Sequence, residues 1–189
     1  MKITFRKLMM TCTLALAGLQ GLEAAEVQVF GGYAVTRMKS ETQDNQATLN
    51  GWNTSLTTYL NNRFGLTADV AGFYGDVKPA ITNGDPVAAR QYSFMGGPQF
   101  RLFHTARFES SVRAVFGGAY GYLPHDGYNN LNQTTFAGLI GSNFDVKISR
   151  HVAMRFSPGL YLTQFGTNQT QKNFRFSAGP VFEFGGGER

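Results

Sequence analysis

The stretch FRFSAGPVFEF, residues 174–184, carries the pattern that decides the fold class of this chain. Its even-numbered positions hold Phe, Phe, Ala, Pro, Phe and Phe, whereas its odd-numbered positions hold Arg, Ser, Gly, Val and Glu. Successive side chains of a β-strand point to opposite faces, so this alternation predicts a strand with one apolar and one polar face. We expect this last strand to span Asn173–Phe184.

Seven further segments upstream alternate in the same way. Each is at least as long as the roughly 9–11 residues that a tilted strand needs to cross a bilayer. Each is also longer than the usual globular strand of about 5–6 residues. The segments are Val27–Arg37, Gly51–Asn61, Phe64–Tyr74, Gln91–Phe103, Arg107–Gly121, Thr135–Lys147 and Val152–Thr163.

The gaps between these segments are alternately long and short. Tight turns are expected near Asn62–Arg63, His104–Ala106 and Ile148–His151. Long connections on one side and short turns on the other are typical of outer-membrane barrels. The pattern therefore predicts an all-β fold, an eight-stranded antiparallel up-and-down transmembrane β-barrel. The long polar gaps are Met38–Asn50, Gly75–Arg90, Tyr122–Thr134 and Gln164–Lys172.

The polar faces of the segments carry equal numbers of acids and arginines among small polar residues. An eight-stranded barrel has an interior only wide enough to be filled by side chains. Arginine suits paired, desolvated sites better than lysine does, and lysine is absent from these faces before the turn residue Lys147. We therefore expect a lumen charge network formed by Asp69, Arg101, Glu109, Arg113, Asp145, Arg155, Arg175 and Glu183.

The aromatic residues of the apolar faces fall into two bands, as in the girdles of a membrane barrel. Toward the long gaps lie Tyr33, Trp52, Tyr74, Tyr92 and Tyr120; toward the short turns lie Phe64, Phe100, Phe108, Phe144 and Phe184. The alternative is a soluble, lipocalin-like barrel in the periplasm, with the apolar faces lining a ligand cavity and the charges in water. The scarcity of lysine and the two aromatic bands favour the membrane barrel.

Some residues break the alternation. Pro98, Pro158 and Pro180 lie within expected strands, where each removes a donor from the ladder, and we predict bulges or missing hydrogen bonds at all three. Five large apolar residues fall on the polar face: Phe30, Tyr59, Phe73, Met95 and Leu139.

The N-terminus is typical of a secretory signal peptide. Three basic residues within the first seven positions precede a short apolar stretch over residues 8–22, and cleavage is expected after Ala24 or Ala25. Of the 17 basic and 12 acidic residues of the chain, 14 and 11 remain in the mature protein. Its net charge of +3 is scattered, which argues against nucleic acid as a partner. No apolar run reaches the roughly 20 residues of a transmembrane helix.

From these segments, the signal peptide and the last strand, the chain resembles the small outer-membrane β-barrel family typified by the transmembrane domain of OmpA. The resemblance implies a location in the outer membrane of a Gram-negative envelope, with lipid as a partner. It also implies that Phe184, the aromatic end of the last strand, is the signal read by the barrel-insertion machinery. The expected organisation is a signal peptide over residues 1–25, a barrel over 26–184 and a short tail over 185–189, without a peptidoglycan-binding domain.

The function expected from this pattern is that of a non-enzymatic surface protein with a plugged lumen and four exposed loops, using no cofactor or metal. Extracellular partners are not indicated by any motif. A small channel and a lipid-modifying enzyme remain as alternatives. The enzyme would need a nucleophile with a base, for which the candidate bases are His104, His125 and His151.

Overall fold

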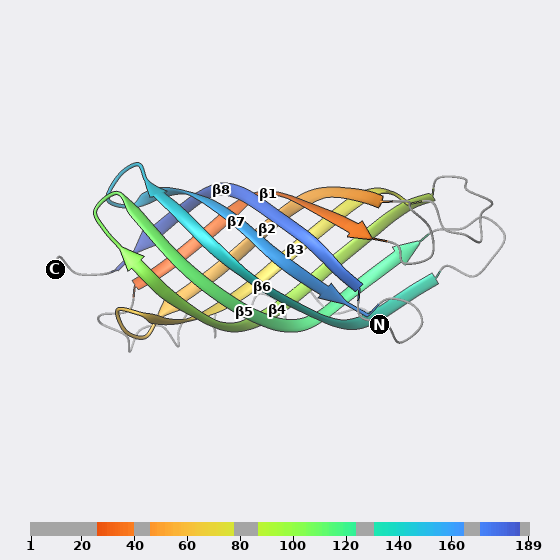
Figure 1. Ribbon diagram of the computed structural model, residues 1–189, viewed down its shortest axis with the longest axis horizontal. Helices are drawn as coiled ribbons and strands as arrows, with labels where there is room; N and C mark the ends of the chain where they lie inside the picture. Colours follow the sequence, from red (N-terminus) through yellow and green to blue (C-terminus); the bar gives the residue numbers. More distant parts are fainter. Residues whose placement is uncertain (1–25, 40–45, 78–86, 124–130, 165–170, 186–189) are drawn as a thin grey trace, which may run out of the picture.

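Eight antiparallel strands close into one barrel in the computed structural model, which describes residues 26–39, 46–77, 87–123, 131–164 and 171–185 (Figure 1). Each strand pairs with its neighbours in chain order, and β1 pairs with β8 to close the sheet. This architecture confirms the predicted fold class. The strands are β1 Glu26–Lys39, β2 Gln46–Tyr59, β3 Phe64–Val77, β4 Val87–His104, β5 Phe108–Leu123, β6 Leu131–Lys147, β7 Val152–Thr163 and β8 Gln171–Phe184.

The three short turns lie together at one end of the barrel, beside the end of β8 (Figure 1). Each is closed by a backbone hydrogen bond of 2.8–2.9 Å, donated by Leu60, Thr105 or Ile148. At the opposite end the strands extend beyond their expected bounds: β2 begins at Gln46 rather than Gly51. Polar residues at these ends conceal the alternation, but the backbone ladder continues through them, as in the Lys39–Gln46 pair.

The two faces of the sheet differ sharply in chemistry. Large apolar side chains are exposed on the outer face of all eight strands, with Phe94 63% and Tyr33 60% accessible. Charged and polar side chains fill the lumen, where Asp69 and Glu109 are 0% accessible. The described part of the chain contains no helix long and apolar enough to cross a membrane. An apolar exterior around a buried polar interior suits a hydrocarbon surrounding.

The three strand prolines coincide with interruptions of the ladder, as predicted. The β4–β5 pairing stops at Gly96 and resumes at Gln99, passing over Pro98. The β6–β7 and β1–β8 pairings skip Pro158 and Pro180 in the same manner. The register is unchanged across each gap, so these are missing pairs rather than bulges. Each proline still pairs with the strand on its other side.

The register shift in the described ladders lies instead between Arg101 and Phe103, near the end of β4. A bulge rotates the side chains that follow it. Here it leaves both Leu102 and Phe103 on the outer surface, 48% and 66% accessible. The bulge was not predicted, because Leu102 and Phe103 are both apolar and the sequence does not show which of them is out of phase.

The close approach of β1 and β8 beside Pro180 requires glycine. A Cβ atom on Gly32 would lie 2.3 Å from the carbonyl oxygen of Ala178, whereas one on Gly31 would meet nothing within 4 Å. We expect Gly32→Ala to lower the free energy of unfolding by about 1–3 kcal/mol, since the backbone itself must move. Gly31→Ala, the matched control, should change it by less than about 0.5 kcal/mol. Urea titration of both variants in detergent measures the difference, and equal stabilities would contradict the tight seam.

Candidate functional site

The interior of the barrel is a set of buried ion pairs. All eight charged residues expected in the lumen face inward, and each is between 0% and 7% accessible. The structure adds Glu26 and Lys147, which join the ion pairs at the turn end. Five carboxylates therefore meet five cations, so the interior is neutral when all of them are ionised.

Arg155 forms a bidentate ion pair inside the lumen. Its Nε and Nη2 donate to the two carboxylate oxygens of Asp145 at 2.7 and 2.6 Å, a bidentate contact between adjacent strands β7 and β6. Nη2 also donates to the Oε1 of Gln28 on β1, at 2.7 Å. Both members of the ion pair are 1% accessible. Bidentate geometry of this kind gives the strongest charge-assisted hydrogen bonds.

Asp69 on β3 binds two arginines, one from β5 and one from β8. Arg113 Nη1 donates to Oδ2 at 3.0 Å, and Arg175 Nη2 donates to Oδ1 at 3.0 Å. Asn53 also donates to Oδ2, at 3.0 Å. One buried carboxylate therefore serves two guanidinium groups.

Glycine makes room for these two long side chains. In the paired row that crosses β5 to β8, Arg113 is opposite Gly141, Gly141 is opposite Gly159, and Gly159 is opposite Arg175. The two positions between the arginines thus have no side chain. The guanidinium groups can therefore reach across the lumen to Asp69.

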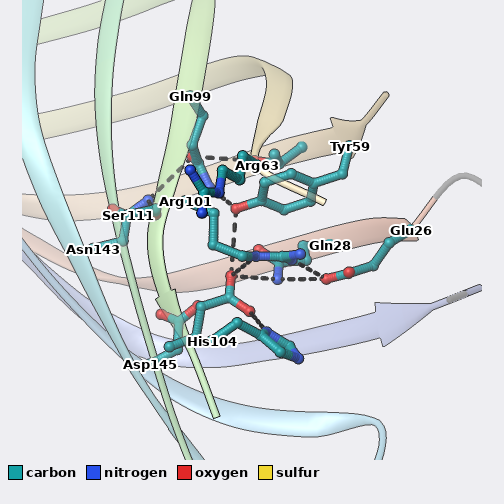
Figure 2. Close-up of polar contacts among 12 residues, drawn as sticks. Glu26, Gln28, Tyr59, Arg63, Gln99, Arg101, His104, Ser111, Asn143 and Asp145 are labelled. Carbon is teal, nitrogen blue, oxygen red and sulfur yellow. Dashed lines mark hydrogen bonds and ion pairs between the residues drawn. The ribbon is translucent and has the colours of Figure 1, made fainter. Parts of the chain in front are cut away.

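A second cluster closes the turn end of the lumen (Figure 2). Arg101 forms ion pairs with Glu109, at 3.1 Å, and with Glu26. Gln28 Nε2 donates to both of these carboxylates at 3.0 Å. His104 Nδ1 lies 2.8 Å from the other carboxylate oxygen of Glu109, and the histidine ring remains 48% accessible at the end of the barrel. Nearby, Lys147 Nζ donates to Glu183 at 2.9 Å.

The cluster is extended inward by uncharged hydrogen-bonding groups. Gln99 Nε2 donates to the hydroxyl of Tyr59 at 2.7 Å, and that hydroxyl donates to Glu109 at 3.3 Å. Asn143 donates to Gln99 at 3.2 Å (Figure 2). Sequence reasoning missed these glutamine and asparagine residues. The signal that identifies them is their phase, since they share the alternation of the charged residues on the same strands.

Aromatic residues that break the alternation support the arginines. The guanidinium carbon of Arg101 lies 3.7 Å from the ring centroid of Tyr59. Arg155 lies 5.7 Å from the ring of Phe30, and Arg175 lies 5.6 Å from the ring of Phe73. Cations are attracted to aromatic faces, most strongly when they are desolvated. Three of the five apolar residues that break the alternation therefore pack against arginine side chains in the lumen.

Three carboxylates at the turn end are close enough to be tested as a metal site. Glu26, Glu109 and Glu183 each place an oxygen within 4.8 Å of the others. Gln28 Nε2 lies among them, within 3.0–3.5 Å of an oxygen of each. Arg101 and Lys147 balance two of the three negative charges. An amide nitrogen thus stands where a cation would bind, and the geometry is that of a hydrogen-bonded ion cluster.

The residues assigned to the two aromatic bands lie on the outer face. Toward the long connections, Tyr33 is paired with Trp52, and Tyr92 is paired with Tyr120. The hydroxyl groups of Tyr74 and Tyr92 are 3.2 Å apart and their rings meet edge to face.

Toward the turns, Phe64 is paired with Phe100, and the rings of Phe108 and Phe144 stack with centroids 6.4 Å apart. Phe184 is 55% accessible and pairs with Val27 where β8 meets β1.

Of the three histidines proposed as bases, the structure brings only His104 to a carboxylate within the described residues. Within the described residues, Glu109 also contacts Gln28, Tyr59 and Arg101, none of which is a serine, threonine or cysteine. His151 is exposed in the last short turn. His125 lies outside the described residues.

Solved structures share this architecture. The attachment invasion locus protein Ail of Yersinia pestis matches with a TM-score of 0.62 and 15% identity, over 85% of this chain and 99% of that chain. Neisserial surface protein A matches with a TM-score of 0.62 and 14% identity, over 85% of this chain and 97% of that chain. The outer membrane protein OprG of Pseudomonas aeruginosa matches with a TM-score of 0.54 and 14% identity, over 86% of this chain and 97% of that chain. No protein-family model and no curated protein sequence matches the chain. The fold is that of the small outer-membrane β-barrels.

Proposed function

We propose that this chain is an integral outer-membrane protein, a non-enzymatic barrel with a plugged lumen that presents its four long connections outside the cell. The main support for the proposal is that the barrel is apolar outside and charged inside, the reverse of the arrangement in a soluble protein. Side chains as apolar as Phe94 and Phe182 are exposed, while Arg155 and Asp145 are 1% accessible inside. In water this arrangement would expose the apolar surface and bury the charges at a large cost. In a bilayer, both faces are in favourable surroundings.

The soluble lipocalin-like alternative requires the opposite arrangement. Its ligand would occupy an apolar cavity in the barrel, and its charged residues would face water. The lumen described here contains ion pairs bridged by Gln28, Gln99 and Asn143. Its apolar members are partly engaged with arginines, as Phe30 is with Arg155. The structure therefore favours the membrane-spanning assignment over a carrier of apolar ligands.

The non-enzymatic role is supported by the contacts that surround the pair formed by His104 and Glu109. Glu109 is held by Arg101, Gln28 and Tyr59 as well as by His104, so it serves several structural contacts at once. The surface role is supported by the composition of the long connections, which are rich in Asn, Gln, Thr, Gly and Asp. The described strand ends that they join lie at the same end of the barrel (Figure 1). Phe184, at the end of the closing strand, is the residue we propose for recognition by the insertion machinery.

The plugged lumen predicts an electrically silent protein. Two groups obstruct the path at different depths: Arg155 with Asp145, and Arg113 with Asp69 and Arg175. Recordings from planar bilayers should show no stable conductance steps, and folding of the added protein is checked independently by the change in gel mobility on boiling. Steady steps of porin size would contradict the plugged lumen and would favour the channel alternative.

A further inference from the structure

The charges of the Asp69 cluster, which comprises Asp69, Arg113 and Arg175, do not balance. One carboxylate meets two guanidinium groups, and the three side chains are 0%, 4% and 1% accessible. Every other carboxylate of the described lumen forms its ion pair with a cation outside this cluster. These carboxylates are Glu26, Glu109, Asp145 and Glu183. The Asp69 cluster therefore holds one surplus positive charge in a buried site.

The two arginines also retain buried N–H groups that do not reach Asp69. Arg113 Nε and Arg175 Nε and Nη1 have no hydrogen-bond acceptor among the described residues. A carboxylate offers about four acceptor sites. Asp69 already accepts one hydrogen bond from Arg113, one from Asn53 and two from Arg175. Because an unsatisfied charged donor in the interior is costly, these groups indicate a further acceptor beside the arginines.

An apolar layer lies between this cluster and the long connections. Ala71 and Phe73 follow Asp69 on β3 in that direction, and both are 0% accessible. The ring of Phe73 lies 5.6 Å from the guanidinium of Arg175 and 6.4 Å from the ring of Tyr161, which is also 0% accessible. Buried apolar side chains complete the layer: Leu49, Val115, Ala119, Ala137 and Leu139. This layer encloses the arginines and supplies no carboxylate to them.

The compensating negative charge lies at the turn end, far from the Asp69 cluster. There, Glu26, Glu109 and Glu183 meet only two cations within the described lumen. His104, which is 48% accessible and 2.8 Å from Glu109, exposes this group of charges to water. Along β5, four residues separate Glu109 from Arg113, a backbone distance of about 13 Å. Because Coulomb attraction falls with distance, the turn end does not neutralise the surplus charge where it lies.

We propose that the Asp69 cluster binds one small monovalent anion, such as chloride, enclosed in the lumen beside Arg113 and Arg175. The anion accepts hydrogen bonds from the buried N–H groups and cancels the surplus charge. Water could accept the same hydrogen bonds but would leave the charge in place, so the charge favours an anion. The two glycines between the arginines, Gly141 and Gly159, keep that part of the lumen wall free of side chains. This inference goes beyond the proposed function, because it concerns the enclosed interior.

Urea titrations of residues 26–189 in a non-ionic detergent test for the anion. Sodium chloride replaces sodium gluconate stepwise at constant ionic strength, so that general screening stays the same. A ligand that binds only the folded state multiplies the folding equilibrium constant by one plus the ratio of its concentration to its Kd. We expect each tenfold rise in chloride well above the Kd to raise this constant about tenfold. No dependence on chloride would show that water satisfies the donors, and would overturn the inference.

Two variants locate the chloride dependence. Arg113→Met removes the surplus charge but leaves Asp69 paired with Arg175, so the dependence should disappear. Arg107→Met, the matched control, removes an exposed arginine and should retain it. Equal chloride dependence in the two variants would contradict the site. The change in gel mobility on boiling shows whether each protein has folded, so a missing anion is distinct from a failed barrel.

Anomalous diffraction locates the ion without any substitution. Crystals of the unaltered protein are grown in sodium bromide, whose anion replaces chloride and scatters anomalously. We expect a peak within hydrogen-bond distance of Arg113 Nε and of Arg175 Nε or Nη1. A peak on the outer surface alone would be an adventitious ion only and would contradict the enclosed site.

Discussion

Replacing Arg155 with alanine is expected to lower the free energy of unfolding by about 3–5 kcal/mol, because it leaves a buried carboxylate without its counter-ion. Arg155 supplies both hydrogen bonds of the bidentate contact with Asp145 and also binds Gln28. Asp145 is 1% accessible, so water cannot replace the lost partner without a rearrangement of the lumen.

Urea titration in detergent, followed by circular dichroism, measures this loss. Arg150→Ala is the matched control, because that arginine is exposed in a turn. A second variant, Arg155→Met with Asp145→Leu, removes both charges and should recover most of the stability, since no unpaired ion remains. An unchanged midpoint for Arg155→Ala would show that the pair is not buried as described.

The replacement Asp69→Asn should be at least as damaging, on the order of 3–5 kcal/mol, because one carboxylate neutralises two buried arginines. Arg113 and Arg175 would then lie unpaired in the same interior, 4% and 1% accessible. Removing one of the two arginines instead is expected to lower the free energy of unfolding by less. Arg113→Met leaves Asp69 with Arg175 at 3.0 Å, so no buried charge loses its last partner.

The difference in stability between these variants tests whether the three residues form one cluster. Unfolding midpoints of Asp69→Asn, Arg113→Met and the double variant should be strongly non-additive, because the three residues share one cluster. Adding Arg113→Met to Asp69→Asn removes an unpaired cation and should recover part of the stability. Additive losses would contradict the three-membered cluster.

The fold was predictable from sequence because one physical constraint acts on every strand. Closure around a polar lumen in an apolar surrounding imposes a period of two on the whole barrel, and the stretch from Phe174 to Phe184 displays it clearly. The strand ends toward the long connections were not predictable, since polar residues such as Gln46 continue the ladder without an apolar face.

The placement of the charges in the lumen could be inferred from phase, but their partners could not. The bond from Arg175 to Asp69 joins residues 106 positions apart, across the lumen from β8 to β3. Strand register and barrel tilt determine which side chains meet, and neither is encoded in a local pattern. Phe30 and Phe73 were misleading for a related reason, because their role depends on arginines from distant strands.

The most direct test of the membrane barrel is a comparison of boiled and unboiled samples by gel electrophoresis, after residues 26–189 have been refolded in detergent. A closed barrel with an apolar exterior should remain folded in the unboiled sample, migrate differently after boiling and show β-type circular dichroism. A protein that remains soluble without detergent and shows no shift on boiling would contradict the account, because the exposed faces of Phe94 and Phe182 could not then be in contact with lipid.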